Sequence, residues 1–459
     1  MVNVKYCKNI RLIMIQFVDR ERELEYLNEV WEENVFQLVI LYGRRRVGKT
    51  ELLKKFLEDK KGAYILLTNE SMRENINYIK NALADVLQEE YVRRLEVENL
   101  YDLFKLVKFG EERLVIILDE FPFLMEINPG ILATFQKIVD EILSKTNVML
   151  ILCGSSLSMM EQDVIGYRSP LYGRRINIWK VQPFDFRTIY SITRDIEKAM
   201  EIYFIFGGIP YYLSFYDESL SLGENIRRNI LTKGRNLYDE PLILLREEFR
   251  ESRIYRLILK YLALGYRSLG KLCSVTGMDR GNLSKYLDTL RETGIVEHII
   301  PYGKRRGGIY EISDPFMDFW FRFVYPHRAE LEMGNIDTTL NTFEKEKNIY
   351  FGHKFERLMR ELLAMKFFPE IAEYDSIGKW WKGEEEVDII ATGNNSMLLG
   401  ECKWSEGIDA EKIIRGMKNV RGISWKGKIE YAIFAKSFKR RSQKAYIYDL
   451  KDIENILKG

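Results

Sequence analysis

Short apolar runs separated by segments with helical spacing organise the first part of the chain. An apolar run of four to eight residues between turn residues is typical of a buried strand in a parallel sheet. Five such runs lie at Leu38–Tyr42, Ala63–Leu67, Leu114–Leu118, Asn147–Cys153 and Ile176–Trp179. Glu51–Leu57, and the leucines between Asn75 and Glu112, have the spacing of helices. The pattern predicts an α/β domain built on a parallel sheet.

The middle of the chain changes to helical patterns followed by a short hairpin. Asp279 is expected to be the N-cap of the helix at Asp279–Gly294. The three helices are expected at Ile254–Leu264, Ser268–Gly277 and Asp279–Gly294, and the two strands at Ile295–Pro301 and Ile309–Ile312. This order resembles the winged helix-turn-helix family. The aromatic stretch Phe316–Tyr325 is interpreted as a packing helix, because it lacks the interleaved basic residues of a base-stacking platform.

The last part of the chain combines a helix with strands. A helix begins at Phe351, and a strand-like segment, Ile371–Tyr374, follows it. Lys379–Ala391 and Ser396–Trp404 are expected to pair as strands, because Gly393–Ser396 between them has turn chemistry.

The first strand leads into Gly43-Arg-Arg-Arg-Val-Gly-Lys-Thr50, which has the spacing of a phosphate-binding loop between a strand and a helix. The glycines let backbone N–H groups face a phosphate, Lys49 adds a positive charge, and the Thr50 hydroxyl can bind Mg²⁺. The helix that follows directs its positive end at the same anion. We expect ATP with Mg²⁺ to be bound by Gly43, Arg44, Arg45, Arg46, Val47, Gly48, Lys49, Thr50 and Glu51.

Two carboxylates follow the third strand, at the edge where parallel sheets bind ligands. Asp119 is expected to hold the magnesium shell and Glu120 to orient or deprotonate the attacking water. A helix cap is the alternative for this pair. Ser155 follows the fourth strand and could touch the γ-phosphate or form part of a turn. Arg174 and Arg175 could be arginine fingers, in their own or a neighbouring subunit, or only surface charge.

These motifs, with Phe17–Glu23 and Phe206–Tyr212, resemble the archaeal ATPase family, which is related to the AAA+ and STAND NTPases. The resemblance covers about Phe17–Leu213. It implies a P-loop fold with a small helical lid, in which Pro210 contacts the adenine and Phe17–Glu23 forms a lip over it. From the residues alone, Pro210 could equally be a proline that only breaks a helix.

The winged-helix segment is locally basic, with eight Lys/Arg against four acids over Gly265–Tyr310. The third helix would place Arg280, Asn282, Ser284 and Lys285 in a major groove of DNA. Lys304, Arg305 and Arg306 at the hairpin tip would contact phosphates. The alternative is a protein-contact module with a solvated hairpin.

Asp388, Glu401 and Lys403 form a D…E-x-K pattern on the last predicted hairpin. The two carboxylates can hold Mg²⁺ or Mn²⁺, and Lys403 can activate a water or stabilise charge on a phosphate. Glu356, on the preceding helix, could supply a further ligand. The alternative is a surface Glu–Lys pair. The segment resembles the PD-(D/E)xK nuclease superfamily and the C-terminal domain of unknown function that often follows archaeal ATPases, which implies either a nuclease or a non-cleaving DNA-binding domain.

Composition changes this picture little. The chain of 459 residues has 46% hydrophobic and 30% charged residues and a net charge of +2, so a nucleic-acid surface must be local. The four cysteines form no CxxC pair, which argues against a disulfide scaffold and fits a reducing cytoplasm. No apolar stretch is long enough for a membrane span, so we expect no membrane partner. Residues before Met14 do not resemble the start of a domain, and Met14 is a candidate start.

We therefore expect four parts: a P-loop ATPase domain at 14–207, a helical lid or connector at 208–250, a winged helix at 251–330 and a nuclease-like domain at 345–459. The expected function is ATP binding and hydrolysis coupled to action on DNA, with a possible metal-dependent nuclease. The alternative is a STAND-like switch, in which ATP drives homo-oligomerisation and the nuclease-like domain is an inactive scaffold.

Overall fold

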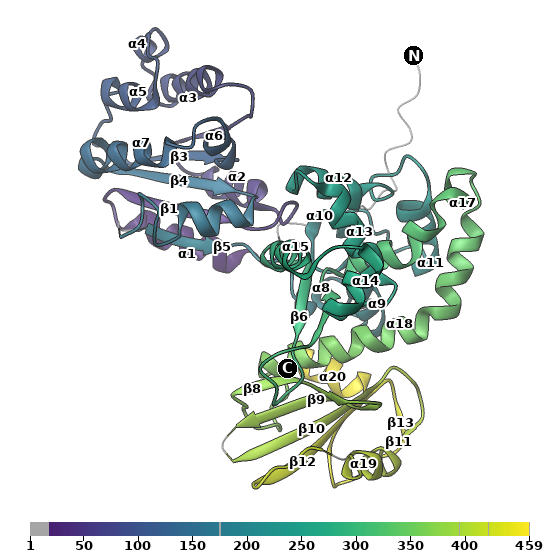
Figure 1. Ribbon diagram of the computed structural model, residues 1–459. Coiled ribbons are helices and arrows are strands. Elements are labelled where there is room, and N and C mark those ends of the chain that lie inside the picture. The colour runs from purple at the N-terminus through teal and green to yellow at the C-terminus, as the bar shows by residue number, and fades with distance from the viewer. Residues whose placement is uncertain (1–17, 174–175, 394, 421, 459) are drawn as a thin grey trace, which may run out of the picture. The chain divides into compact units, whose positions relative to one another are not determined.

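The computed structural model describes residues 18–173, 176–393, 395–420 and 422–458 (Figure 1). The chain forms two compact units. The N-terminal unit contains residues 18–183 and returns for Ile209–Ser214, whereas the C-terminal unit contains Phe184–Gly208 and residues 215–458. No described helix is both long and apolar enough to cross a membrane.

The N-terminal unit is built on a parallel five-stranded sheet with the order β2-β3-β4-β1-β5, as the apolar runs predicted. Every residue of β1, β3 and β4 is buried, which explains why these strands read as continuous apolar runs. The strands are β1 (Gln37–Tyr42), β2 (Gly62–Leu66), β3 (Leu114–Asp119), β4 (Val148–Gly154) and β5 (Ile176–Lys180).

Helices cover both faces of this sheet. Successive residues of a strand point to opposite sides, so the apolar residues of each strand form a core on both faces. Leu38 and Ile40 of β1 belong to the core beneath α3, α5, α6 and α7, whereas Val39 and Leu41 pack with α1 and α2. The helical segments are α1 (Glu21–Glu32), α2 (Lys49–Leu57), α3 (Met72–Leu87), α4 (Glu90–Arg93), α5 (Leu100–Leu106), α6 (Pro122–Ile127), α7 (Ile131–Lys137), η1 (Ile138–Ile142), η2 (Leu143–Lys145), η3 (Met159–Val164) and α10 (Pro210–Leu213). The region predicted as helical from Asn75 to Glu112 is therefore interrupted, and Asn99 caps α5 by accepting the Asp102 N–H.

The C-terminal unit begins with helices and a winged helix. The predicted three helices and hairpin are confirmed, and the Asp279 side chain caps α15 by accepting the Asn282 N–H. The elements are α8 (Phe186–Thr193), α9 (Ile196–Phe206), α11 (Leu222–Asn225), η4 (Ile226–Leu231), α12 (Glu240–Glu248), α13 (Ser252–Ala263), α14 (Leu269–Thr276), α15 (Arg280–Glu292), β6 (Val296–Ile299) and β7 (Ile309–Ile312).

Aromatic residues and one long helix hold this unit together. The stretch from Phe316 is buried, and Trp320 is fully buried with its indole N–H donating to the Tyr238 carbonyl at 2.8 Å, so its interpretation as packing is confirmed. The predicted helix at Phe351 is the second half of a much longer one. The elements are α16 (Pro315–Phe319), η5 (Trp320–Val324), η6 (Tyr325–His327), α17 (Arg328–Glu332) and α18 (Ile336–Ala364).

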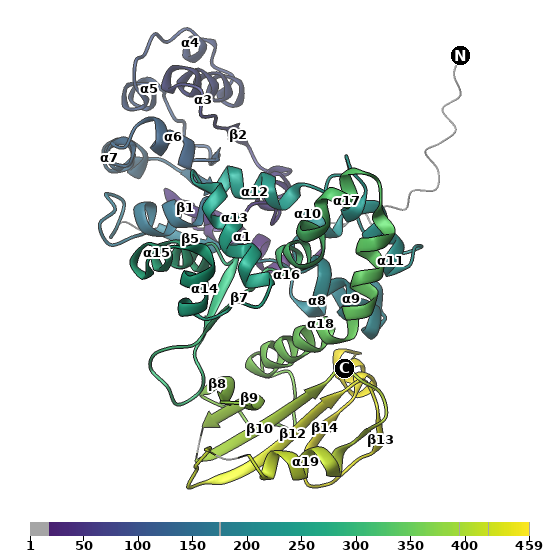
Figure 2. The same cartoon turned by 45° about the vertical axis from the view of Figure 1, so that its right-hand side comes forward.

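A mixed sheet of order β14-β12-β10-β9-β8 completes the unit (Figure 2). β8, β9 and β10 are antiparallel neighbours, whereas β10, β12 and β14 run parallel. The elements are β8 (Ser376–Lys382), β9 (Glu385–Gly393), β10 (Ser396–Lys403), β11 (Ile408–Asp409), α19 (Ala410–Lys418), β12 (Lys428–Ala435), β13 (Phe438–Arg440), β14 (Tyr446–Tyr448) and α20 (Leu450–Lys458). The strand expected at Ile371–Tyr374 is wrong: the Ile371 N–H closes a turn on Phe368, and pairing with β9 begins only at Asp375.

Candidate functional site

The loop from Gly43 to Gly48 curls between β1 and α2 as its spacing predicts. A Cβ atom on Gly43 would lie 2.4 Å from the Val181 carbonyl oxygen, so only glycine fits there. Gly48 and Arg46 have φ angles of +94° and +68°, which turn the backbone back on itself. The Lys49 ammonium lies inside the curl and donates to the carbonyls of Gly43 (2.8 Å) and Arg44 (3.1 Å).

Asp119 joins the phosphate-binding loop to the neighbouring strands. It is 1% exposed, and its Oδ2 accepts hydrogen bonds from the Thr50 hydroxyl at 2.9 Å and the Tyr64 hydroxyl at 2.6 Å. Burial and the adjacent Asp119 carboxylate raise the pKa of Tyr64 well above its usual range. The structure thus brings Thr50 and Asp119 together as expected. Sequence reasoning missed Tyr64, whose place depends on β2 lying beside β3.

Glu120 is held in an uncommon backbone conformation beside Asp119. Its φ angle is +56°, which costs about 1–2 kcal/mol for a residue with a side chain. The neighbouring Phe121 N–H donates to the Cys153 carbonyl at 2.8 Å, and the Ser155 hydroxyl donates to Glu120 Oε2 at 2.8 Å. Ser155 therefore orients the Glu120 carboxylate.

Arg20 is a further member of this site that the sequence reasoning missed. The side chain is buried and forms an ion pair with Glu23 at 2.8 Å. Its Nη2 donates to the carbonyls of Val47 (2.9 Å) and Gln182 (3.0 Å), so it ties the phosphate-binding loop to the segment after β5. Arg20 lies within the predicted Phe17–Glu23 segment, but the sequence does not show that its side chain is buried or that it reaches the phosphate-binding loop.

The other residues predicted to contact the nucleotide have contacts elsewhere or lie outside the described residues. The Arg46 guanidinium lies 4.2 Å from the centre of the Tyr211 ring, and Pro210 is at the first turn of α10 beside it. Glu51 is exposed and pairs with Lys54 at 3.1 Å. Arg174 and Arg175 lie outside the described residues. The roles of these residues in nucleotide binding stay predictions.

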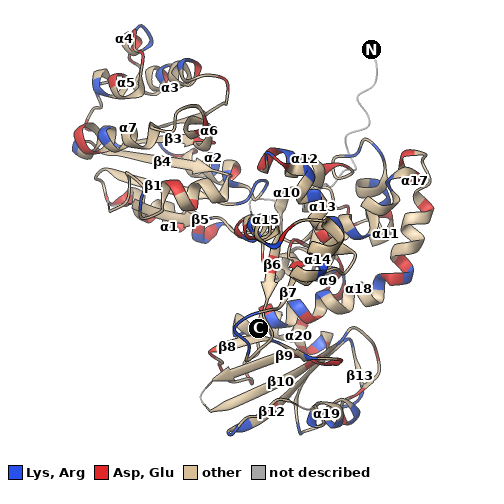
Figure 3. Ribbon diagram, in the orientation of Figure 1, with Lys and Arg blue, Asp and Glu red and all other residues tan. Residues whose placement is uncertain are grey.

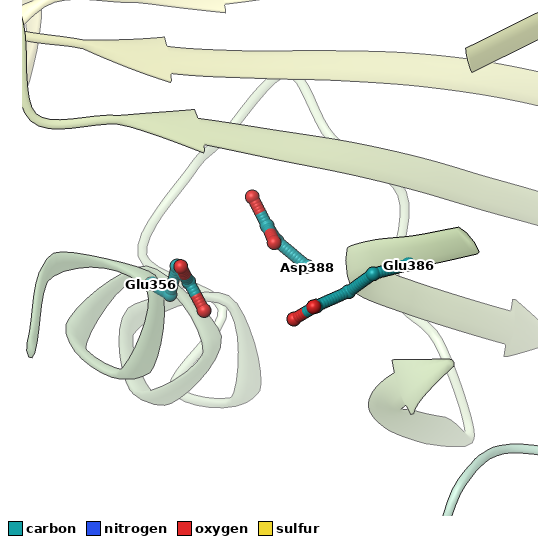
Figure 4. A group of neighbouring side chains, drawn as sticks. All are labelled: Glu356, Glu386 and Asp388. Atoms are coloured by element: carbon teal, nitrogen blue, oxygen red, sulfur yellow. The ribbon is translucent and has the colours of Figure 1, made fainter. Parts of the chain in front are cut away.

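Three carboxylates converge in the C-terminal unit (Figure 4). Oxygens of Glu356, on α18, and of Glu386 and Asp388, on β9, all lie within 4.8 Å of one another. Burial raises the pKa of Asp388 to about 7, and the charges of Glu356 and Glu401 act in the same direction. The Cys402 N–H donates to Asp388 Oδ2 at 2.9 Å and opposes this shift. We call Glu356, Glu386 and Asp388 the carboxylate cluster.

Two lysines border the carboxylate cluster. Lys379 donates to Glu356 Oε2 at 2.9 Å and also pairs with Glu386, whereas Lys403 lies 2.5 Å from Glu401. Burial alone would raise the pKa of Glu356, but the hydrogen bonds and charges of His353 and Lys379 lower it to about 2. Glu401 is outside the group of three, and its role as a metal ligand stays a prediction. Glu386 was missed, although its spacing of two from Asp388 places both on one strand face.

The winged helix exposes the basic residues that were expected to contact DNA, but two of the polar residues expected beside them are placed differently. Arg280 and Lys285 on α15 and all of Lys304–Arg306 at the hairpin tip are exposed. Ser284 is half-buried, and the Asn282 amide donates to Asp279 Oδ2 at 2.7 Å, so it contributes to the helix cap.

Three known families match successive parts of the chain. Residues 17–215 match the family described as an ATPase domain predominantly from Archaea. Residues 255–298 match the bacterial regulatory proteins of the arsR family, a helix-turn-helix family, and residues 320–414 match a family of archaeal and bacterial proteins of unknown function. The first part of the chain is therefore an ATPase domain, and a helix-turn-helix region follows it.

Several similar individual proteins come from archaea. An uncharacterised protein of Methanocaldococcus jannaschii is 32% identical over 452 residues, which cover 95% of this chain and 99% of that protein. An uncharacterised ATP-binding protein of the same organism is 62% identical over 48 residues, 10% of this chain and 81% of that protein. A solved Walker-type ATPase of Pyrococcus abyssi is similar at 23% identity, with a TM-score of 0.49, over 66% of this chain and 96% of that chain. The ORC2 protein of Aeropyrum pernix is similar at 16% identity, with a TM-score of 0.43, over 74% and 99%.

The position of Arg20 predicts that it supports nucleotide binding from behind the loop. Arg20→Ala removes the hydrogen bonds to Val47 and Gln182 and leaves the buried Val47 carbonyl unpaired, at a cost of about 1–3 kcal/mol. We expect the dissociation constant for a fluorescent ATP analogue to rise about tenfold, measured by anisotropy titration. Arg22→Ala, at an exposed position of α1, is the matched control and should bind as the parent does. Equal affinities of the two variants would refute the role of Arg20.

Proposed function

This chain belongs to the same family as the uncharacterised M. jannaschii protein, and we propose that it hydrolyses ATP·Mg²⁺ and uses the nucleotide state to control binding to DNA. The observation that carries the proposal is the alignment of Lys49, Thr50, Asp119 and Glu120 at the carboxyl edge of one parallel sheet. The match to the archaeal ATPase domain supports the same chemistry.

Each residue at this edge would have a separate role in phosphoryl transfer. Lys49 would exchange its bonds to the Gly43 and Arg44 carbonyls for phosphate oxygens. The oxygen donors of Thr50 and Asp119 suit Mg²⁺, which neutralises phosphate charge when it is bound. Glu120, oriented by Ser155, would accept a proton from the attacking water. Lys49 and Glu120 thus position and activate the reacting groups.

Replacing the proposed base separates binding from hydrolysis. Glu120→Gln keeps the size of the side chain and an acceptor for Ser155 but removes the charge, so ATP binding should persist. We expect the turnover rate in a phosphate-release assay to fall by about a hundredfold or more. Glu126→Gln, on the exposed face of α6, is the control and should hydrolyse ATP at the parental rate. Parental turnover in Glu120→Gln would contradict the assignment.

The proposal that the second unit binds DNA rests on the winged helix. The match to the arsR helix-turn-helix family and the exposed Arg280, Lys285 and Lys304–Arg306 support it. The rival is a STAND-like switch, in which ATP drives oligomerisation and the winged helix binds protein. DNA affinity that depends steeply on salt distinguishes the two, because phosphate contacts release counterions.

Neutralising the hairpin tip should weaken DNA binding and its dependence on salt. For Lys304→Ala/Arg305→Ala/Arg306→Ala, we expect the slope of log K against log [salt] to fall in magnitude by about three, since each phosphate contact contributes about 0.9. The measurement is anisotropy of a labelled duplex at several salt concentrations. Lys54→Ala/Lys55→Ala/Lys61→Ala, three exposed lysines of the N-terminal unit, is the charge-matched control. An unchanged slope in the hairpin variant would exclude these contacts.

We propose a second activity, metal-dependent cleavage of the phosphodiester backbone, for the C-terminal unit. The carboxylate cluster supports it, because its oxygens lie close enough to share one Mg²⁺ or Mn²⁺. Lys403 beside Glu401 could stabilise charge on the phosphate, as in the D…E-x-K pattern. A hard cation there would supply a bound water for attack.

Asp388→Asn tests this second activity. Asparagine can still accept the Cys402 N–H, so the fold should survive, but one anionic ligand is lost. We expect cleavage of supercoiled DNA with Mn²⁺ to fall by about two orders of magnitude, because a catalytic metal supplies several kcal/mol. Asp375→Asn, at an exposed position of the same unit, is the control. Cleavage by Asp388→Asn at the rate of the control would assign the activity elsewhere, and no cleavage by the parent would favour a non-cleaving DNA-binding domain.

A further inference from the structure

The wing of the winged helix is joined to the mixed sheet of the same unit. The loop between β6 and β7 reaches β8 (Figure 2), where the Tyr302 N–H donates to the Lys379 carbonyl at 2.9 Å. The Tyr302 hydroxyl donates to Thr392 Oγ1 at 3.3 Å, and its ring packs against the core that includes Trp380 and Val387. The wing therefore covers the β8 edge of the sheet, where backbone groups would otherwise lack a neighbouring strand.

Lys379, which accepts the hydrogen bond from the wing, also contacts the carboxylate cluster. The Lys379 backbone carbonyl pairs with Tyr302, while its ammonium pairs with Glu356 and Glu386. One residue of β8 thus contacts the wing through its main chain and the carboxylate cluster through its side chain. The opening of the cluster is at Glu386, whose side chain is exposed, whereas Asp388 is buried.

The length of the chain limits how far the basic tip can lie from this point. Lys304 follows Tyr302 by two residues, and its N–H closes a turn on the Pro301 carbonyl at 3.1 Å. Two residues span at most about 7 Å, and the four to Arg306 at most about 14 Å. The major groove of DNA alone is about 12 Å wide. A duplex that contacts the tip therefore lies within reach of the neighbouring edge of the sheet.

We propose that Lys304–Arg306 and the opening of the carboxylate cluster form one binding surface for a DNA duplex, with the wing seating a phosphodiester backbone beside Glu386. This inference rests on the proposed DNA binding of the second unit and adds the place where the duplex lies. Basic residues mark the loop beside β8 (Figure 3), and Lys379 neutralises part of the acidic charge beneath it. The wing is thereby a positioning element for the carboxylate cluster.

Acidic residues near the carboxylate cluster oppose the binding of a DNA duplex at this surface. Glu384 and Glu386 are exposed close to the opening and repel a phosphate backbone, so the cations of the wing must hold the duplex against that repulsion. A wing that served only to cover the sheet edge would need Tyr302 but none of the three exposed cations that follow it. The three exposed cations of the basic tip are therefore available to an anionic ligand at this edge.

The test is photo-crosslinking of the full chain to a duplex of about three helical turns, without divalent metal so that no cleavage is needed. Glu384→Cys places a cysteine-linked aryl azide two residues from Glu386. Lys451→Cys places the same probe on α20, which packs against β14 at the opposite edge of the sheet. The unsubstituted chain, labelled identically, gives the background from Cys273 and the other native cysteines. DNA binding by each protein is measured separately by anisotropy.

We expect the Glu384→Cys probe to crosslink about tenfold more DNA than the Lys451→Cys probe at equal occupancy, because a short tether raises the local concentration only at the bound duplex. Adding Lys304→Ala/Arg305→Ala/Arg306→Ala should remove this excess, even at DNA concentrations that restore occupancy through the rest of the winged helix. Bound DNA with equal crosslinking at the two positions would overturn the shared surface and leave DNA binding intact. No DNA binding by anisotropy would overturn both proposals.

Discussion

In the C-terminal unit, a partly buried arginine on one turn of α18 joins three elements through ion pairs and a hydrogen bond. Arg357 forms ion pairs at 3.0 Å with Glu297 on β6 and with Glu361 on its own helix, and the Tyr203 hydroxyl of α9 donates to Glu361 at 3.2 Å. Burial acts to lower the pKa of Arg357, but the charges of Glu297 and Glu361 outweigh it and raise that pKa. The network joins α18 and α9 to β6, the strand that leads into the wing.

The same turn fixes the carboxylate cluster. Glu356 precedes Arg357 and points into the cluster, and Arg360 donates to the Asp388 carbonyl at 3.0 Å. The helix that carries one carboxylate of the cluster thus also holds the backbone of another. Since Arg357 binds the wing strand from the same helix turn, the geometry of the wing and the geometry of the cluster have a common support. This shared support is the physical reason to treat the two as one surface.

The sequence predicted those parts of the molecule whose chemistry is local. The phosphate-binding loop and Asp119–Glu120 could be read because each follows directly from a buried strand, and the parallel order then brings Thr50 to Asp119. Tyr64 and Arg20 were missed because their contacts depend on which strands are neighbours and on segments 27 and 162 residues away from Arg20. Lys379 was missed because its ion pairs join β8 to β9 and α18, which the sequence does not show to be neighbours, whereas Glu386 was missed although its spacing of two from Asp388 could be read. Ile371–Tyr374 was wrong because an apolar residue closing a turn resembles the start of a strand.

The path of the chain connects the surroundings of the phosphate-binding loop to the second unit through a short segment. The chain leaves the N-terminal unit after residue 183, returns for Ile209–Ser214 and leaves again, so this segment of six residues is tied to the other unit at both ends. Arg46 of the phosphate-binding loop contacts Tyr211 within it. On the other side, the Phe184 N–H donates to the Gly208 carbonyl at 2.8 Å, and a Cβ on Gly208 would lie 1.9 Å from the Phe184 carbonyl oxygen. The two crossings of the chain are therefore held together by a contact that only glycine permits, next to the segment that Arg46 contacts.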